Sequence, residues 1–428
     1  MSDLISYILE FLLQDKAYVK YVGYTKDASE WKNYKVVIVP SEFFDYHKAG
    51  TPLMPHTPLQ TLDGMPILFG EAMPPEVAQS SQSVSNTNAT KVIKADLVAS
   101  AFFLLSRYEE KINTRRDHHG RFSAIESILT KEKILDRPIV DEYGCFLRQA
   151  LREAGVNIPE PKAEMSVTLT HDVDVPFVYR SIVSILGGIK RGEFKTLFKS
   201  FFKSLEKNPF YTFPWLLEQD EKLENARKIY FLRSPLFPEY YDRPYLKIDS
   251  RDMRSLIKTL QNHNVELGLH ASYASAEHLE LVSQEKVSIE QTINKPLTTN
   301  RNHYLRLTSN NQLDALAEAG IKEDFTIGFA EMPGFRMGTC RPVKYINPDT
   351  LEVTDLVLHP LTMMDGSFSK YSQMGYTKAY ETACRLIDEV RKHGGELVML
   401  WHNSEVRKGN YHRQLYKNLI SYIKNEKK

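Results

Sequence analysis

Short runs of apolar and β-branched residues alternate with longer helical stretches through the second part of the chain. The pattern predicts seven strands, at residues 166–170, 228–232, 265–269, 298–301, 323–326, 355–358 and 396–401. Strands separated by helix-length segments are typical of parallel β/α units. The pattern alone leaves two α/β folds open, a closed barrel and an open doubly wound sheet.

The first part of the chain has a different pattern. Residues 35–40 form a short β-branched run closed by proline, as in a buried strand, and residues 96–110 carry apolar side chains at helical spacing. Pro159-Glu160-Pro161 cannot continue a helix and is typical of a hinge. We therefore expect a smaller N-terminal α/β domain of unknown function at 1–160 and a larger domain at 161–428.

Composition narrows the functions that this chain can have. The 55 basic and 54 acidic side chains leave a formal net charge of +1, so no overall charge draws the protein to nucleic acid. Three cysteines without a CxxC pair predict neither a disulfide framework nor a thiolate zinc site. The N-terminal apolar run lacks a basic leader, and no run reaches the roughly 18 apolar residues of a membrane span. We therefore expect a cytoplasmic protein.

One segment of the second domain combines apolar and cationic residues. We expect a helical insertion at about 177–225, between the first two predicted strands of that domain. Within it, residues 181–205 interleave lysine and arginine with phenylalanine and leucine. A helix of this kind lies on a membrane surface, with its lysines at lipid phosphates, or packs on its own protein. A peripheral membrane contact is one of these two alternatives, and the sequence does not indicate an oligomeric state.

Polar side chains follow the ends of several predicted strands. Asp172 and Asp174 end the first one, and because residues i and i+2 of an extended chain face the same way, they can converge on one cation. Three later strands are followed by the histidines His270, His303 and His402. Carboxylate and imidazole are common ligands of catalytic zinc. Since the carboxyl ends of parallel strands meet on one rim, we expect an active site there.

A second polar cluster lies in the first domain. Residues 115–121 read Arg-Arg-Asp-His-His-Gly-Arg. The cluster resembles a ligand-binding patch but has no partner motif elsewhere in the sequence. An ordinary polar loop and a binding role both stay open for it.

Five short motifs resemble, in order and approximate spacing, those of the polysaccharide deacetylases. They are Thr170-His-Asp-Val-Asp174, Gly268-Leu-His270-Ala-Ser, Arg301-Asn-His-Tyr304, Asp324 and Leu400-Trp-His402. This is the NodB-homology group, carbohydrate esterase family four. Residues 101–110, 117–122 and 137–141 resemble the N-terminal signature of a two-domain bacterial branch found in surface-polysaccharide loci. The resemblance covers nearly the whole chain and implies a distorted (β/α)7 barrel.

The resemblance also implies roles for individual residues. Asp172 matches the catalytic base that takes a proton from the attacking water, and Arg301 matches the arginine that keeps this carboxylate ionised. His402 matches the general acid that protonates the departing amine, with Asp324 as the carboxylate that orients it. The first motif departs from the family pattern because Val173 separates its two aspartates.

The metal ligands implied by the resemblance are Asp174 and His270. The family has a second histidine four positions after the first, where this chain has Ala274, and we take His303 as the third ligand instead. Two weaker candidates are His171 and Ser275. The implied cation is zinc, with cobalt or nickel as alternatives, and it would polarise the carbonyl of the substrate.

Loops on the same rim are expected to shape the substrate pocket. The predicted sugar contacts are Arg336, Tyr345, Asp365 and Trp401. We expect hydrolysis of N-acetyl groups from an amino sugar in a bacterial surface polysaccharide or its precursor. The alternatives are a catalytically silent carbohydrate-binding or scaffold protein and a metallohydrolase that acts on another amide.

Overall fold

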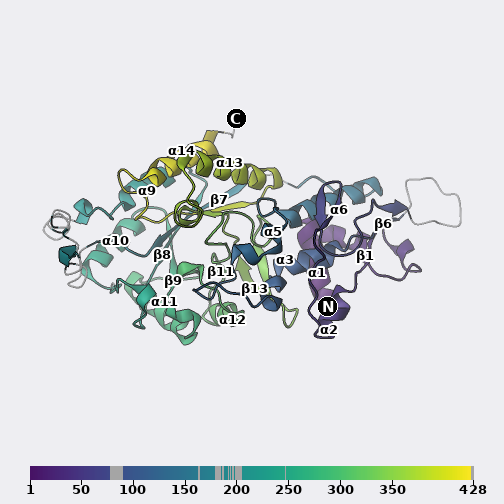
Figure 1. The fold of residues 1–428 in the computed structure, drawn as a ribbon, viewed down its shortest axis with the longest axis horizontal. Helices are drawn as coiled ribbons and strands as arrows, with labels where there is room; N and C mark the ends of the chain where they lie inside the picture. Colours follow the sequence, from purple (N-terminus) through teal and green to yellow (C-terminus); the bar gives the residue numbers. More distant parts are fainter. Residues whose placement is uncertain are drawn as a thin grey trace.

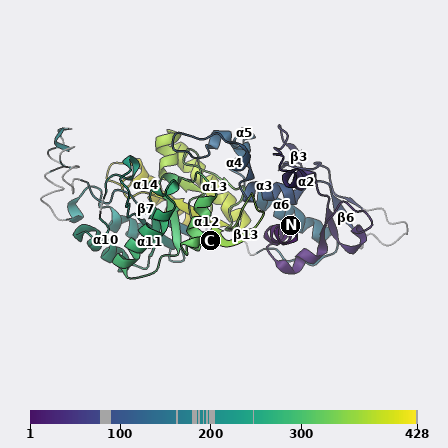
Figure 2. The same cartoon turned by 90° about the horizontal axis from the view of Figure 1, so that it is seen from below.

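The computed structural model describes residues 1–77, 90–161, 164–178, 205–245 and 247–425, together with 185, 188–190, 192, 194 and 197. Two groups of elements lie next to each other along the longest axis of this α/β protein (Figures 1 and 2). Most of residues 181–205, for which the sequence suggests a membrane contact, lie outside the described residues. Among the helices of the described part, none has the length and apolarity needed to cross a membrane.

The N-terminal group is built on a four-stranded sheet in the order β1-β2-β6-β5. The strands are β1 (Val22–Tyr24), β2 (Val36–Ile38), β6 (Lys91–Ile93) and, antiparallel at the edge, β5 (Glu76–Val77). A separate hairpin joins β3 (Gln60–Leu62) to β4 (Met65–Ile67). The longer helices are α1 (Ser2–Leu13), α3 (Leu97–Leu105) and α6 (Ile139–Glu153), and the shorter ones are α2 (Phe43–Lys48) and α5 (Ile128–Lys131).

The helix predicted over 96–110 is in fact two helices. Asp96 caps α3, because its side chain accepts a hydrogen bond from the backbone amide of Ala99. Helix α3 ends at Leu105, and Arg107, which precedes the next helix, adopts the left-handed conformation with a φ of 58°. A second helix, α4 (Tyr108–Ile112), then follows. Apolar periodicity continues across this break, so it could not reveal the turn.

The C-terminal group contains a nine-stranded sheet in the order β12-β13-β11-β10-β9-β8-β7-β15-β14. All seven predicted strands belong to it: β7 (Ser166–Val173), β8 (Arg227–Leu232), β9 (Glu266–Ala271), β10 (Thr299–Asn302), β11 (Glu323–Asp324), β13 (Val353–Leu358) and β15 (Glu396–Leu400). Neighbouring strands are parallel, except that β12 (Val343–Ile346) is antiparallel to β13. The sequence pattern missed β12 and the two-residue β14 (Met363–Met364).

The sheet curls into a half-barrel with helices around its outside (Figure 1). In the described part of the chain no ladder joins β12 to β14, so these are the two edge strands. The outer helices are α9 (Phe213–Asp220), α10 (Arg251–Gln261), α11 (Glu280–Ile293), α12 (Asn311–Glu318), α13 (Tyr376–His393) and α14 (Tyr411–Asn425). Apolar side chains such as Phe231, Phe325 and Val398 fill the middle of the inner face.

An ionic network on the same inner face connects the amino-terminal ends of β8, β9, β11 and β15. The guanidinium of Arg227 on β8 lies 2.8 Å from Glu266 on β9 and 2.6 Å from Glu323 on β11. The ring of His359, just after β13, lies 3.0 Å from Glu323 and 2.6 Å from Glu396 on β15. The network therefore connects four strands below the apolar layer. It does not include the opposite rim of the half-barrel, at the carboxyl-terminal ends of these strands.

This network predicts a pH-dependent contribution to stability. Burial by itself lowers the pKa of His359, but its hydrogen bonds with Glu323 and Glu396 outweigh burial and raise the pKa to about 9. An unfolded histidine titrates near 6.5, so this stabilisation is complete below about pH 6.5 and is lost as the pH rises towards 9. We expect the destabilisation caused by His359→Gln to shrink by about 3 kcal/mol between pH 5.5 and 9.5. Urea unfolding of the unmodified protein and the variant at both pH values measures the difference in their free energy of unfolding. A difference that did not change with pH would contradict the expectation.

Candidate active site

The carboxyl-terminal ends of β7, β9 and β10 bring three candidate ligands together. Asp174 follows β7, His270 lies near the end of β9, and His303 follows β10. Strands β9 and β10 are neighbours, with Arg301 opposite His270. One ligand atom from each of Asp174, His270 and His303 lies within 4.8 Å of the other two. These are the three residues that the sequence suggested as metal ligands.

Both histidines turn the same nitrogen towards Asp174. Nδ1 of His270 lies 2.7 Å from the carbonyl oxygen of Arg301, which can only accept, so this nitrogen carries the hydrogen. Nδ1 of His303 lies 2.8 Å from Oδ1 of Asp242 and donates in the same way. The Nε2 atoms of His270 and His303 lie 3.1 and 3.5 Å from Oδ1 of Asp174. Metal-binding histidines are usually oriented by such carbonyl and carboxylate partners.

The carboxylate of Asp174 fits a cation. Its Oδ1 is buried, and no donor in the described part of the chain makes an aligned hydrogen bond to it. Burial opposes ionisation, but the nearby His303, His270 and His402 lower the pKa of Asp174 well below its usual value. Two imidazole nitrogens and one carboxylate oxygen form a donor set that suits zinc, which has three protein ligands in catalytic sites.

The two histidines differ in their protonation. Burial and the charge of Arg233 lower the pKa of His303 to about 4, so its Nε2 is free to act as a ligand at neutral pH. Burial also disfavours a charge on His270, but Asp172 and Asp174 outweigh it and raise the pKa of that ring. A proton on His270 and a bound cation would compete for the same space between His270 and Asp174.

Asp172 forms a buried ion pair beside this cluster. Nη1 of Arg301 donates to Oδ1 of Asp172 at 3.1 Å and to the hydroxyl of Thr170 at 2.6 Å. Nε of Arg301 donates to the carbonyl of Phe325 at 3.0 Å, which fixes the guanidinium from the other side. Oδ2 of Asp172 lies 3.6 Å from Nε2 of His270. One oxygen of Asp172 is therefore held by arginine while the other faces the cluster.

His402, directly after β15, is oriented by Asp365. Nδ1 of His402 donates to Oδ1 of Asp365 at 2.8 Å, and its backbone amide donates to Oδ2 at 2.7 Å. Nε2 lies 3.5 Å from Oδ2 of Asp174. Burial opposes a charge on the ring, but Asp365 and Asp174 raise the pKa of His402 to about 9. The ring is therefore a cation at neutral pH and can donate a proton.

Asp324 does not orient His402, so that prediction was wrong. Its carboxylate accepts hydrogen bonds from Asn300 at 2.8 Å and from the amide and hydroxyl of Thr326 at 2.9 and 2.8 Å. Strand β11, which carries Asp324, is separated from β15 by β10, β9, β8 and β7 in the sheet. The orienting carboxylate, Asp365, instead directly follows β14, the immediate neighbour of β15. Since β14 has only two residues, no sequence pattern marked it.

The four predicted sugar contacts find no support in the structure, because all four side chains are buried and none of them lines the cavity that opens over the cluster. Trp401 is 0% exposed and packs 5.4 Å from the ring of Tyr416 on the outer side of the sheet. Tyr345 is 0% exposed on β12, and Asp365 is engaged by His402. Arg336 pairs with Glu110 of the N-terminal group, at 2.9 Å.

The two weaker ligand candidates also lie outside the cluster. The ring of His171 faces outward and contacts the carbonyl of Trp401 at 2.7 Å and the carboxylate of Asp220 at 3.1 Å. The hydroxyl of Ser275 donates to the carbonyl of Ser272 at 2.7 Å. Both side chains are satisfied by structural hydrogen bonds, and neither belongs to the group of atoms around Asp174.

Sequence reasoning missed Asp242, the partner of His303. This residue is 0% exposed and ends a short helical turn, Tyr240–Asp242, in the loop after β8. It also accepts hydrogen bonds from the backbone amides of Tyr273 and Ala274, at 2.8 and 3.2 Å. Asp242 therefore ties the loop after β9 to the ring of His303. No spacing or composition signal distinguished this carboxylate from others in loops.

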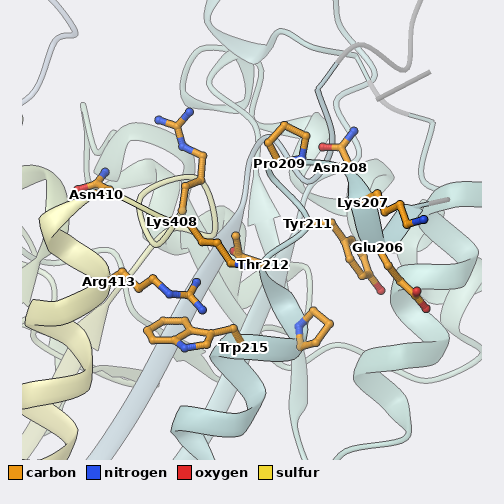
Figure 3. A pocket seen from close by; sticks show the side chains of 13 residues that line it. Glu206, Lys207, Asn208, Pro209, Tyr211, Thr212, Trp215, Lys408, Asn410 and Arg413 are labelled. Carbon is orange, nitrogen blue, oxygen red and sulfur yellow. The ribbon is translucent and has the colours of Figure 1, made fainter. Parts of the chain in front are cut away.

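A cavity of about 300 Å³ opens over these groups. Asp172, Asp174, His303 and His402 contribute to its lining. Its wall contains three tyrosines and three cations that sequence reasoning did not assign to the site: Tyr241, Tyr304, Tyr371, Arg121, Arg243 and Lys370. A larger cavity of about 1010 Å³ lies elsewhere, where Arg413 stacks on Trp215 at 4.0 Å beside Lys408 (Figure 3). That cavity contains none of the candidate catalytic residues.

Comparisons with known proteins find one family model and several solved structures. Residues 2–155 match a family of unknown function, DUF7033. No curated protein matches the chain. Among solved structures, the chain is similar to one named as a polysaccharide deacetylase from Mycobacterium smegmatis. The identity is 16%, the match covers 63% of this chain and 87% of that chain, and the TM-score is 0.43.

Two further similar structures are mutants of a CE4 family pseudoenzyme, one of which has restored enzymatic activity. Each is 11% identical, with TM-scores of 0.33 and 0.32. The matches cover 62% and 63% of this chain and 64% and 65% of those chains.

Proposed function

We propose that this protein removes N-acetyl groups from an amino sugar of a bacterial surface polysaccharide or its precursor, with a divalent cation held by Asp174, His270 and His303. Zinc is the first candidate. The observation that carries the proposal is the buried Oδ1 of Asp174, which has no aligned donor in the described part of the chain and faces two Nε2 atoms. The proposal includes a distorted (β/α)7 barrel at 161–428, preceded by a separate domain at 1–160.

The reaction would divide between the cation and the residues around it. When bound, the cation polarises the acetamide carbonyl and stabilises the charge that develops on its oxygen. Asp172 accepts a proton from the water that attacks the carbonyl carbon. Its hydrogen bond from Arg301 holds one carboxylate oxygen and leaves the other directed towards the cluster.

His402 completes the reaction at the nitrogen. As the bond between the carbonyl carbon and nitrogen breaks, Nε2 of His402 donates a proton, so that acetate and an amine are released. Asp365 holds Nδ1 of the ring and thereby keeps Nε2 turned towards the cavity. Residues from four strand ends, those of β7, β9, β10 and β15, thus serve as base, acid and ligands on one side of the half-barrel.

A glycan-binding protein without activity is the second candidate. It is favoured by Ala274, which stands where the family has a ligating histidine. A protein of this kind would keep the cavity and its tyrosines but would not release acetate.

Metal content and acetate release test these candidates together. We expect full-length protein to retain about one zinc per chain and to release acetate from chitooligosaccharides, with activity lost on chelation and restored by zinc. One zinc per chain without acetate release, from glycans acetylated on nitrogen or oxygen, would favour the silent protein. Turnover of other amides alone would indicate a different metallohydrolase. A protein that binds no divalent cation would contradict the proposal.

A further inference from the structure

A loop of the N-terminal group, residues 117–121, is organised by its own hydrogen bonds. Oδ1 of Asp117 accepts from the backbone amides of His119 and Arg121, both at 2.9 Å. Oδ2 of Asp117 accepts from Nε of Arg121 at 2.8 Å. The side chain of Arg121 is therefore held in one direction before any ligand binds.

The same loop docks on the C-terminal rim. Nη1 of Arg121 donates to the carbonyl of Tyr304 at 2.7 Å. Nε of Arg306 donates to the carbonyl of His119 at 2.8 Å, and the ring of His119 lies 3.2 Å from the hydroxyl of Tyr273. Three hydrogen bonds thus attach residues 117–121 to the loops that follow β9 and β10.

The contact with Tyr304 lies directly beside the candidate metal site. Tyr304 follows His303, and the two rings lie 4.7 Å apart. Tyr304 and Leu305 have φ values of 63° and 51°, in the left-handed region that side chains other than glycine rarely adopt. Backbone in this region persists where surrounding contacts hold it, often at functional sites. The hydrogen bond from Arg121 is one of these contacts.

The cavity wall next to this loop is cationic and aromatic. Arg121 lines the cavity together with Arg243 and Lys370. Arg121 is paired with Asp117 at 2.8 Å, and Lys370 with Glu405 at 3.3 Å. Arg243 is exposed and has no ion pair within the part of the chain that the structure describes. Guanidinium groups match the geometry of carboxylates and phosphates, and the tyrosines offer flat faces for a sugar ring.

We propose that residues 117–121 form part of the substrate pocket and that Arg121, Arg243 and Lys370 select a glycan with a carboxylate or phosphate on or beside the sugar being deacetylated. The inference rests on the proposed function and narrows its substrate class. It also assigns a role to a loop in the region that matches a family of unknown function.

Direct binding of three small probes tests the charge preference. The probes are N-acetylglucosamine, which is neutral, N-acetylmuramic acid, which carries a carboxylate, and N-acetylglucosamine 6-phosphate. With full-length protein in a calorimeter, we expect at least one anionic probe to bind about tenfold more tightly than the neutral one, as charge-assisted hydrogen bonds allow. The stronger anionic probe identifies the group selected. Equal affinities, or no binding of any probe, would overturn the inference.

Substitutions locate the preference in this cavity. Arg243→Gln should remove most of it, because Arg243 is exposed and no ion pair of the described part depends on it. Arg121→Gln should also remove the preference for the anionic probe. Thermal unfolding of that variant shows whether the preference was lost because recognition failed or because the protein no longer folds. Lys408→Gln is the control, since Lys408 is also exposed but lines the larger cavity of Figure 3. If Lys408→Gln alone abolished the preference, the anion site would be that larger cavity and the inference would be wrong.

These measurements separate the inference from the proposed function. Probe binding requires no turnover, and metal content is measured independently. An intact anionic preference in a protein that never releases acetate would remove the proposed function and leave the pocket as a glycan-binding site. Acetate release without any preference for charge would remove only the inference.

Discussion

Replacing Asp174 with asparagine is expected to remove the bound zinc and to lower acetate release by about 10³-fold. Asparagine keeps the size of the side chain but removes the negative charge that a divalent cation needs between two neutral imidazoles. Its amide would also have to direct either an oxygen or an NH₂ group at the Nε2 atoms, which lie 3.1 and 3.5 Å from Oδ1 of Asp174. Elemental analysis of the purified variant and steady-state acetate release measure the two effects.

A surface histidine provides the control for this experiment. His263 also contacts a carboxylate, Glu221, at 2.7 Å, but its side chain is 37% exposed and it lies outside the cluster. We expect His263→Ala to keep the zinc content and activity of the unmodified protein. Zinc that stayed near one per chain in Asp174→Asn would show that the cation binds elsewhere.

Replacing Asp365 with asparagine is expected to lower kcat by roughly 10²- to 10⁴-fold, the range for loss of a proton-transfer group. Asp365 favours the charged form of His402 and holds its Nδ1 at 2.8 Å. Asparagine has no negative charge to stabilise the imidazolium form of His402, so His402 can no longer supply a proton to the leaving nitrogen. Zinc content and KM should change little, because Asp365 does not belong to the group of atoms around the candidate metal site.

The matched comparison is Asp324→Asn, the carboxylate to which the sequence assigned this role. Burial raises the pKa of Asp324, and its contacts with Asn300 and Thr326 hold two strands together on the far side of the sheet. We expect that variant to lose some thermal stability and to keep kcat within about threefold, since no proton-transfer group depends on it. If Asp324→Asn instead lowered kcat more than Asp365→Asn, the assignment made from the sequence would be restored.

Much of the fold could be predicted because local patterns were sufficient for it. Five of the seven strands have apolar runs between helical segments, whereas β10 and β11 are polar, and all seven are present in the sheet. Asp174, His270 and His303 could be proposed together because parallel strands end on one rim. The alternation of side chains along β15 even implied that Trp401 and His402 face opposite sides of the sheet. The prediction of Trp401 as a sugar contact overlooked this rule.

Other parts of the site depend on neighbours that are distant in the chain. Asp365 lies next to His402 only because β14 pairs with β15, and a strand of two residues has no hydrophobic pattern. Arg121 reaches the rim through a hydrogen bond to Tyr304, which lies 183 positions later. Such contacts arise when preformed elements pack, and no spacing along the sequence encodes them.

The sequence by itself determined seven strands of the C-terminal sheet and the polar side chains at their ends, because most of them follow from the pattern of neighbouring residues. Only the tertiary structure decided which carboxylate orients each histidine, as with Asp242 for His303 and Asp365 for His402. It also decided that a loop of the N-terminal group lines the cavity. The physical reason is that hydrogen bonds and charges act over a few ångströms in space, whatever number of residues separates the partners.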